Sequence, residues 1–478
     1  MPDSALKSLE DRARHDLECL AYPTRGWSLP ETHAGKPVLD SLIIGGGQSG
    51  IAIAFGLKRE GIDNTLVVDR RPEGLEGPWI SFARMITLRT PKHVTGPDLG
   101  IASLSPRAWY EARFGIEAWA KLGKIPRQHW AEYLQWLRRL TGVRLRSATE
   151  VVDVEPLPGP LFAVTLRDAG TGATEKITAR SVVLATGIEG AGRWTILPQV
   201  AEALPRERYG HTSEAIDFDA LKGKRILVLG AGASAFDNAA TALEAGAARV
   251  DLLARRKTMP VVNPNRWMEF AGFMRHFADL DDAMKWRFMR HIFKLNQPPP
   301  QDTFERCARF AGFALHTGTP LDAIGMEGDE IVADTPSGQF RCDYLILGTG
   351  FHVDFATRPE TARFAADIAL WRDRYEAPAE LEDRVLAGFP YLSDAFQLQE
   401  KVPGSNPHLS RLYCYTFAAM PSLAGSAGIS AMKFGVPRLV QGVTRQLFLD
   451  QADGHLASLT AYDEPELVMP DKTAREVA

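Results

Sequence analysis

The sequence has 478 residues, of which 45% are hydrophobic and 24% charged, with a formal net charge of −4. A chain of this length is expected to form two or three domains, because single cores stop growing well below this size. The charge balance argues against a nucleic-acid partner, which requires a strongly basic surface. Four cysteines without a C-x-x-C pair argue against a disulfide framework or a dithiol redox centre, and they favour the cytoplasm.

The first predicted element is a charged amphipathic helix within residues 1–37, which lacks the apolar core of a signal peptide. Residues 412–432 carry no charged side chain and could suggest a membrane span. Pro421 and several glycines and serines nevertheless make this segment too polar to cross a membrane. We expect the segment to be buried and the protein not to reside in a membrane.

Residues 38–61 predict a buried strand, a tight turn and a helix. Gly45, Gly47 and Gly50 form the pattern G-x-G-x-x-G, in which the glycines permit the turn, the approach of a pyrophosphate and helix–strand packing. The helix N-terminus offers free N–H groups to the phosphates. Asp69, at the end of the next strand, can accept hydrogen bonds from ribose hydroxyls. The unit therefore predicts an FAD site.

The middle of the chain contains a helix over residues 127–140 and strands near 149–155 and 161–167. A buried strand at 181–187 ends in Ala-Thr-Gly, and a matching strand at 342–351 ends in Gly-Thr-Gly. Such strands are typical of crossings between two nucleotide-binding domains, although any buried strand can end at a glycine.

A second strand–turn–helix unit carries Gly230, Gly232 and Ala235, and alanine is an accepted variant at the third position. Ala254 occupies the position that corresponds to Asp69, at the same spacing from the first glycine of its turn. The second site therefore lacks the ribose-binding acid. A carboxylate there would repel a 2′-phosphate, so its absence predicts NADPH at this site.

Arg255, Arg256 and Lys257 follow Ala254, and an arginine fork can bind a 2′-phosphate through two hydrogen bonds. The same residues could instead form a solvated surface turn. Arg70 and Arg71 occupy the matching positions in the first unit. The absence of the acid therefore distinguishes an NADPH site from an FAD site better than the arginines do.

Residues 263–300 have apolar side chains at helical spacing, with Phe270, Phe273, Met274 and Phe277 at i, i+3, i+4 and i+7. One interpretation is core packing, and the other is a flexible apolar wall around a substrate. The prolines at the end of this segment are expected to end the helix.

The sequence thus predicts an α/β fold with two Rossmann-like dinucleotide-binding domains, in which the NADPH domain is inserted into the FAD domain. We expect an N-terminal helical segment at 1–37 and the first part of the FAD domain at 38–205. The NADPH domain is expected at 206–345, and the rest of the FAD domain with C-terminal helices at 346–478.

With these motifs in place, the chain resembles the class B flavin-dependent monooxygenases, which comprise flavin-containing monooxygenases, N-hydroxylases and Baeyer–Villiger enzymes. The resemblance covers about residues 38–440. It rests on GGGQSG, EGPW, ITLRTPK, ATG, GKRILVLGAGASAFDNA and GTGF as they stand in this sequence.

The resemblance implies that Trp79 and the segment 88–92 line the flavin and that Val151 contacts the adenine. It also implies that AGSAG at 424–428 begins a helix at the flavin ring. Cofactor contacts are therefore expected at the following residues: Gly45, Gly47, Gln48, Ser49, Gly50, Asp69, Arg70, Trp79, Leu88, Thr90, Lys92, Val151, Gly187, Gly230, Gly232, Ala233, Ser234, Ala235, Arg255, Arg256 and Gly350.

The resemblance implies that NADPH reduces FAD, that O₂ forms a C4a-(hydro)peroxyflavin, and that one oxygen atom passes to a small organic substrate. No metal and no catalytic residue are assigned. Pro205 and Glu207 replace residues of a subclass signature before His211, so the type of oxygenation stays open. His211 is given no chemical role. Arg84 or Arg89 could hold a peroxy anion, although binding of cofactor phosphates or surface carboxylates is the commoner role of such arginines.

Two other functions fit the same architecture. One is an NAD(P)H-dependent flavin reductase or oxidase, which in its disulfide-reducing form would need a dithiol beside the flavin. The other is a catalytically silent protein that senses NADPH. The expected partners are a small organic substrate and O₂, without nucleic acid or membrane, and either a monomer or a homo-oligomer is compatible with the sequence.

Overall fold

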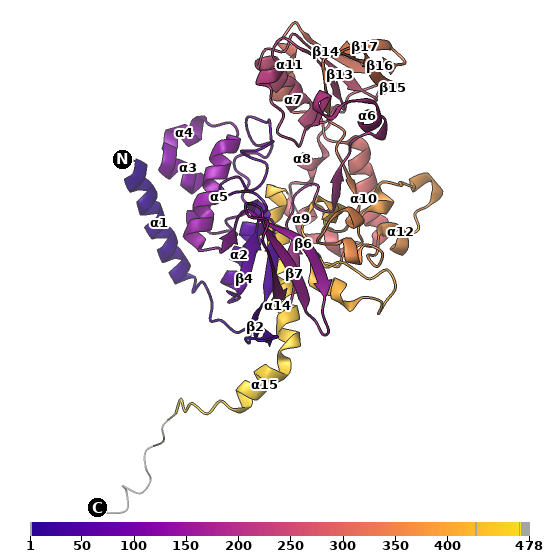
Figure 1. The fold of residues 1–478 in the computed structure, drawn as a ribbon. Helices are drawn as coiled ribbons and strands as arrows, with labels where there is room; N and C mark the ends of the chain where they lie inside the picture. The colour runs from indigo at the N-terminus through magenta and orange to yellow at the C-terminus, as the bar shows by residue number, and fades with distance from the viewer. Residues whose placement is uncertain (1, 426–427, 468, 470–478) are drawn as a thin grey trace, which may run out of the picture.

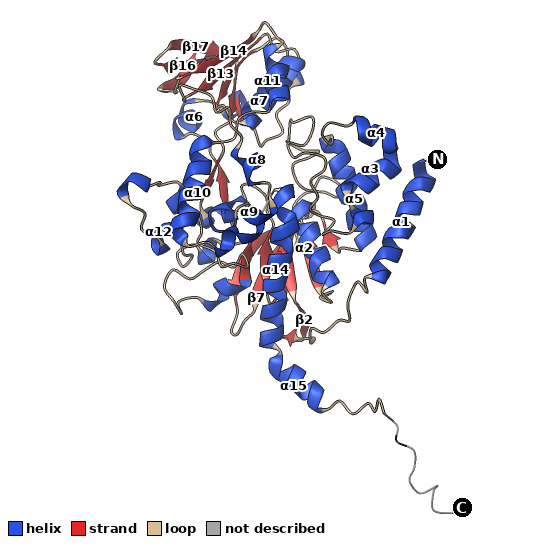
Figure 2. Ribbon diagram, turned by 180° about the vertical axis from the view of Figure 1, so that it is seen from behind, coloured by secondary structure: helices blue, strands red, loops and turns tan. Residues whose placement is uncertain are grey.

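The computed structural model describes residues 2–425, 428–467 and 469 of the chain (Figure 1). Its ribbon has two lobes. The smaller lobe contains α7, α11 and β13 to β17, and the larger lobe contains α1, α5 and the long helix α14. Figure 2 shows the same division from behind.

The larger lobe is built on a fully parallel sheet with the strand order β20-β9-β3-β4-β5. Its central strand is buried at every residue, as expected for a parallel strand that is covered on both faces. The strands are β3 (Ser41–Ile44), β4 (Thr65–Val68), β5 (Leu145–Arg146), β9 (Val182–Leu184) and β20 (Leu412–Cys414).

A second sheet in this lobe has the order β1-β2-β8-β7-β6, in which only β2 and β8 are parallel neighbours. Its strands are β1 (Thr32–His33), β2 (Lys36–Leu39), β6 (Thr149–Pro156), β7 (Phe162–Asp168) and β8 (Thr174–Ala179). The single strand predicted before Gly45 is therefore wrong, because the chain changes sheets at Asp40. This buried carboxylate accepts a hydrogen bond from Arg180 at 2.7 Å, and so the break is stabilised by an ion pair.

The smaller lobe contains a second fully parallel sheet with the order β11-β18-β12-β13-β14. Its strands are β11 (Tyr209–His211), β12 (Arg225–Leu229), β13 (Arg249–Ala254), β14 (Phe313–Thr317) and β18 (Tyr344–Leu347). An antiparallel sheet of β15 (Ala323–Glu327), β16 (Glu330–Thr335) and β17 (Gly338–Cys342) adjoins it.

Two short strands connect the lobes. β10 (Gly192–Trp194) follows β9, β19 (Phe351–Val353) follows β18, and the two pair in antiparallel register. The second parallel sheet therefore lies between β9 and β20 in the sequence, although these strands are neighbours in the first sheet. The predicted α/β fold with two parallel-sheet units, one inserted into the other, is confirmed.

The helices follow the predicted pattern in most places. The helix predicted after Pro126 is α5 (Arg127–Thr141). The main helices are α1 (Pro2–Cys19), α2 (Gln48–Arg59), α3 (Pro106–Phe114), α4 (Ile116–Lys121), α5, α6 (Pro198–Ala203), α7 (Ala233–Glu244), α8 (Pro264–Met268), α9 (Ala271–His276), α10 (Asp282–Leu295), α11 (Gln301–Ala308), α12 (Trp371–Arg374), α13 (Met420–Leu423), α14 (Ile429–Asp450) and α15 (Ala452–Thr460).

The apolar segment 263–300 forms α8, α9 and α10 rather than one continuous helix. Phe273, Phe277 and Met289 are buried in the core that also contains the first parallel sheet. Phe270 is instead 48% exposed. Most of these apolar side chains therefore belong to the core, in agreement with the first of the two interpretations.

The uncharged segment at 412–432 begins with the buried strand β20 and continues through α13 to α14. Among the described residues, no helix has both the length and the apolar character that a membrane span requires. Ser426 and Ala427, in the predicted AGSAG helix start, lie outside the described residues, and α14 begins at Ile429.

Candidate functional site

A cavity of about 260 Å³ lies where β3, β4 and β9 end. The ends of parallel strands are the usual place for a ligand in this type of sheet. Nine predicted cofactor residues line the cavity: Gly45, Gly47, Gln48, Ser49, Asp69, Arg70, Trp79, Val151 and Gly187. The structure therefore brings together residues from the first glycine turn, the next strand, β6 and the first crossing.

The first glycine turn has the close contacts that its sequence predicts. Gly45 has a φ of +110°, and a methyl group there would lie 2.4 Å from the carbonyl oxygen of Ala185. Gly50 lies beneath the turn, where a methyl group would lie 1.9 Å from the Gly45 carbonyl oxygen. Helix α2 begins directly after the turn and has no side-chain cap, and Gln48 and Ser49 of its first turn line the cavity.

Asp69 lies at the cavity wall and is 8% exposed. Its carboxylate accepts hydrogen bonds from the backbone N–H groups of Gly46 and Arg71, both at 2.8 Å. A carboxylate has about four acceptor positions, so two remain for the hydroxyls of a ribose. The two backbone contacts hold the carboxylate in place for that role.

The cavity fits FAD in its chemistry. The glycine turn offers the close backbone approach that a pyrophosphate needs, and Asp69 offers acceptors to a ribose. The indole Nε1 of Trp79 is buried and has no hydrogen-bond partner among the described residues. A cofactor in the cavity could accept a hydrogen bond from this group, which would otherwise be costly to bury.

The second glycine turn is equivalent to the first in its backbone contacts. The N–H of Gly45 donates to Val68 at 2.8 Å, and the N–H of Gly230 donates to Leu253 at 3.0 Å. Ala254 follows Leu253 as Asp69 follows Val68, so the two positions correspond in space as well as in spacing. No acid therefore occupies the ribose position of the second unit.

The remaining predicted residues of the second unit surround this turn. Gly232 precedes the first residue of α7, which again has no side-chain cap, and Ala233, Ser234 and Ala235 form its first turn. Arg255 is exposed and Arg256 is half-buried. Neither guanidinium forms an ion pair within the described part of the chain, so both are available to a phosphate. Their assignment to NADPH stays a prediction.

Four predicted residues lie away from the cavity. Leu88, Thr90 and Lys92 are not among its lining residues, and the Lys92 ammonium donates to the Trp119 carbonyl at 2.6 Å. Gly350 lies in the second crossing, where its carbonyl accepts from the N–H of Thr195 at 2.9 Å. Contacts between these residues and a cofactor stay predictions.

The cavity also has lining residues that the sequence did not indicate. Arg358 and Glu360 lie just after the second crossing, and their side chains form an ion pair of 2.6 Å. Trp194 lines the cavity from the first crossing. No motif marks these residues, but their place beside the two crossings could have suggested them. Both crossings therefore contribute to the wall of the cavity.

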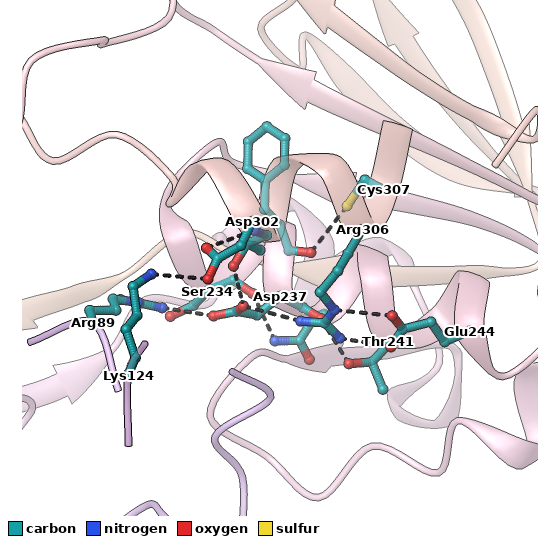
Figure 3. Close-up of polar contacts among 12 residues, drawn as sticks. Arg89, Lys124, Ser234, Asp237, Thr241, Glu244, Asp302, Arg306 and Cys307 are labelled. Atoms are coloured by element: carbon teal, nitrogen blue, oxygen red, sulfur yellow. Dashed lines mark hydrogen bonds and ion pairs between the residues drawn. The ribbon is translucent and has the colours of Figure 1, made fainter. Parts of the chain in front are cut away.

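Arg89 and Arg84, considered above as cations for a peroxy anion, have different surroundings. Arg89 donates to Asp237 of α7 at 2.8 Å (Figure 3). Lys124 likewise reaches Asp302 of α11 at 2.9 Å. Arg89 thus has a carboxylate partner and joins the two lobes, whereas Arg84 forms no ion pair among the described residues.

His211 ends β11 and is 1% exposed. The N–H of Ser213 donates to its Nδ1 at 3.2 Å, and its ring lies 5.0 Å from the ring of Trp194. Burial lowers the pKa of His211 from 6.5 to about 4. The imidazole is therefore neutral near pH 7 and is packed where the first crossing enters the second sheet.

We expect His211 to make the protein less stable in acid. The unfolded chain binds a proton at His211 near pH 6.5, whereas the folded protein does so only near pH 4. This stability is present above pH 6.5 and is lost as the pH falls toward 4, by up to ~3 kcal/mol. Urea unfolding at several pH values should show a smaller loss in His211→Asn than in the wild type, and equal losses would contradict this role.

The cysteines do not form a redox centre at the cavity. Cys307, Cys342 and Cys414 are buried, and Cys19 is exposed at the surface. Burial raises the pKa of Cys307 and Cys342 to about 12 and that of Cys414 to about 11. No cysteine is among the residues that line the described cavity.

Comparison with known proteins identifies the class. Residues 42–292, more than half of the chain, match the family described as pyridine nucleotide-disulphide oxidoreductase. The chain belongs to this family, and it is a flavin-dependent enzyme with the two dinucleotide-binding units of the class B monooxygenases. The predicted resemblance, the enzymatic nature of the protein and FAD as its cofactor are confirmed.

The chain is 43% identical over 465 residues to the FAD-dependent urate hydroxylase of Xanthomonas campestris pv. campestris, covering 97% of this chain and 98% of that protein. The ornithine hydroxylase of Pseudomonas aeruginosa has a similar fold, with a TM-score of 0.66, 17% identity, and 86% and 99% of the two chains covered. The bacillithiol disulfide reductase of Staphylococcus aureus gives a TM-score of 0.55 at 17% identity, covering 85% and 98%. At these identities the structural likenesses concern the fold alone.

Proposed function

We propose that this protein is an NADPH-dependent flavoprotein monooxygenase that hydroxylates urate. The observation that carries the proposal is the identity of 43% with a urate hydroxylase along almost the whole length of both chains. The two glycine turns support it, because one retains the ribose-binding acid and the other lacks it. The relatives support flavin-dependent hydroxylation in general. That urate is the substrate and NADPH the coenzyme is our proposal.

When FAD is bound, it supplies the transfer of electrons from NADPH and the activation of O₂. The protein's own part is to bind and orient the reactants. The first turn and Asp69 would hold the pyrophosphate and a ribose of FAD, while the second turn and Arg255 would hold NADPH. Trp79 and Trp194 would shield the cavity from water. The route of oxygen transfer expected from the resemblance remains a prediction.

The overall reaction consumes urate, O₂, NADPH and one proton, and it yields hydroxylated urate, NADP⁺ and water. The purified, FAD-loaded protein should therefore consume urate, NADPH and O₂ in equal amounts. Urate and NADPH can be followed by absorbance and O₂ by an electrode in the same sample. NADPH consumption that urate does not accelerate would overturn the proposal and favour the reductase or oxidase function.

Arg255→Ala tests the choice of coenzyme. We expect the KM for NADPH to rise about tenfold to a hundredfold, which corresponds to ~1.4–2.7 kcal/mol for a lost charge-assisted phosphate contact. The KM for NADH should change little, because NADH has no 2′-phosphate. The exposed Arg107, which pairs with Glu111 on α3, offers a matched control as Arg107→Ala. Equal losses for both coenzymes would exclude a 2′-phosphate contact at Arg255.

The disulfide-reductase alternative has less support. A dithiol beside the flavin is what that reaction needs, and the cysteines have neither the spacing nor the place for it. A silent NADPH sensor is the remaining alternative, and the stoichiometry experiment also tests it. A sensor would bind NADPH without consuming O₂.

A further inference from the structure

Arg84 and Arg127 are neighbouring cations, and Arg84 lies between the two lobes. Arg84 follows the cavity residues Trp79 and Phe82 in the chain, and Arg127 begins α5. The Arg127 guanidinium donates to the carbonyl oxygen of Trp79. Neither arginine is among the lining residues of the FAD cavity, but Arg127 contacts the backbone of Trp79, which is one of them.

Arg84 also contacts the smaller lobe. Its guanidinium donates to the Ser81 carbonyl at 3.0 Å and lies 3.5 Å from the Ile216 carbonyl oxygen. It lies over the ring of Phe218, 5.1 Å from the ring centre. Ile216 and Phe218 belong to the core of the NADPH-type unit. Arg84 thus joins the segment that follows Trp79 to the second dinucleotide unit.

The two arginines have no acidic partner. Neither forms an ion pair with any described residue, and the Nε of Arg84 is buried without a hydrogen-bond partner. Burial first and the nearby Arg127 second lower the pKa of Arg84, and burial lowers that of Arg127. Two cations that are close together and partly desolvated cost free energy, and a bound anion would offset this cost.

Three other partly buried arginines of this protein are paired with an acid, whereas Arg59 has only the Leu99 carbonyl and the Tyr22 hydroxyl as hydrogen-bond partners in the described part of the chain. Arg180 has Asp40 at 2.7 Å, Arg306 has Glu244 at 2.7 Å, and Arg358 has Glu360 at 2.6 Å. Arg84 and Arg127 differ from Arg59 in that two neighbouring cations share the absence of an acid among the described residues, so a bound anion would neutralise both.

We propose that Arg84 and Arg127 bind the negatively charged edge of an anionic, planar heterocyclic substrate between the two lobes. This inference rests on the proposed function, since urate is such an anion at neutral pH. Planar guanidinium groups match a delocalised anion through paired hydrogen bonds, and the Phe218 ring adds a flat apolar surface beside Arg84. The phosphates of NADPH already have the second glycine turn and the start of α7.

The test compares Arg84→Gln, Arg84→Lys and Arg127→Gln with the wild type and with the surface control Arg107→Gln. All proteins are loaded with FAD, and their bound flavin and melting temperature establish that they are folded. Binding is followed by the change in flavin absorbance on titration with urate and, separately, with xanthine at mildly acidic pH, where urate is an anion and xanthine is uncharged. Titration with NADP⁺ measures coenzyme binding in the same way.

We expect Arg84→Gln and Arg127→Gln each to weaken urate binding about tenfold to a hundredfold and to leave xanthine and NADP⁺ binding nearly unchanged. Arg84→Lys should restore part of the urate affinity, and Arg107→Gln should behave as the wild type. Weaker NADP⁺ binding with unchanged urate binding would mean that the anion is a coenzyme phosphate and would overturn the inference. Equal losses for urate and xanthine would also overturn it.

The outcome is separable from that of the proposed function. If wild-type protein binds urate more tightly than xanthine but does not hydroxylate it, the proposed reaction fails while the anion preference stands. If the wild type hydroxylates urate and the arginine variants do so with unchanged KM, the reaction stands and this inference fails.

Discussion

Gly50→Ala is expected to yield a protein that purifies without FAD. The added methyl group would lie 1.9 Å from the carbonyl oxygen of Gly45, so α2 and the turn cannot keep their present distance. Neither group is a flexible side chain, and the backbone itself must move. A shift of this kind costs ~3 kcal/mol, which corresponds to about a hundredfold weaker FAD binding.

The measurement is the ratio of flavin to protein absorbance after purification, followed by titration of the apoprotein with FAD. Ala235→Gly is the matched control, because position 235 is the equivalent of position 50 in the second turn. Removal of a methyl group there creates no clash, and FAD should remain bound. FAD binding of Gly50→Ala at wild-type affinity would show that the first turn does not form the flavin site.

Asp237→Ala is expected to lower the free energy of unfolding by ~3–5 kcal/mol. The Asp237 side chain is 3% exposed and accepts from Arg89 at 2.8 Å and Thr303 at 3.2 Å, with Arg306 at 3.6 Å. Its removal leaves two cations without their buried partner. Because Arg89 belongs to the larger lobe, one of the ion pairs between the lobes is lost as well, and we expect slower flavin reduction by NADPH.

Glu244→Ala provides the comparison for Asp237→Ala. Glu244 pairs with Arg306 and Arg309 but is 29% exposed and joins elements of one lobe only. Its loss should cost less than ~1 kcal/mol and leave the rate of flavin reduction unchanged. Urea unfolding of the FAD-loaded proteins and anaerobic stopped-flow measure the two quantities. Equal destabilisation by both variants would contradict the special position of Asp237.

Local patterns in the sequence were sufficient for the two glycine turns, because the contact between Gly50 and Gly45 lies within one turn, although Gly45 also approaches the distant Ala185. The missing acid at Ala254 could also be predicted from the sequence, since the strand and turn around it repeat those of the first unit. The strand before Gly45 was misread, because its break depends on Arg180, which is distant in sequence. An apolar pattern cannot reveal a buried ion pair of this kind.

The remaining site residues depend on tertiary contacts. Arg358 and Glu360 line the cavity because the second crossing returns the chain there. The difference between Arg89, which has Asp237, and Arg84, which has no acid, likewise arises from the approach of the two lobes. Residue type alone could not separate these two arginines, although only one of them is free to bind an anion.

The insertion of one sheet between β9 and β20 has a consequence for synthesis on the ribosome. β9 emerges early, but its outer neighbour β20 is made only after the whole inserted unit. During that interval β9 forms an open edge with unpaired backbone groups, which is a site for aggregation. The inserted unit has all five strands of its parallel sheet within its own segment and can fold first. The sheet of the larger lobe can therefore be completed only late in synthesis, after β20 has been made.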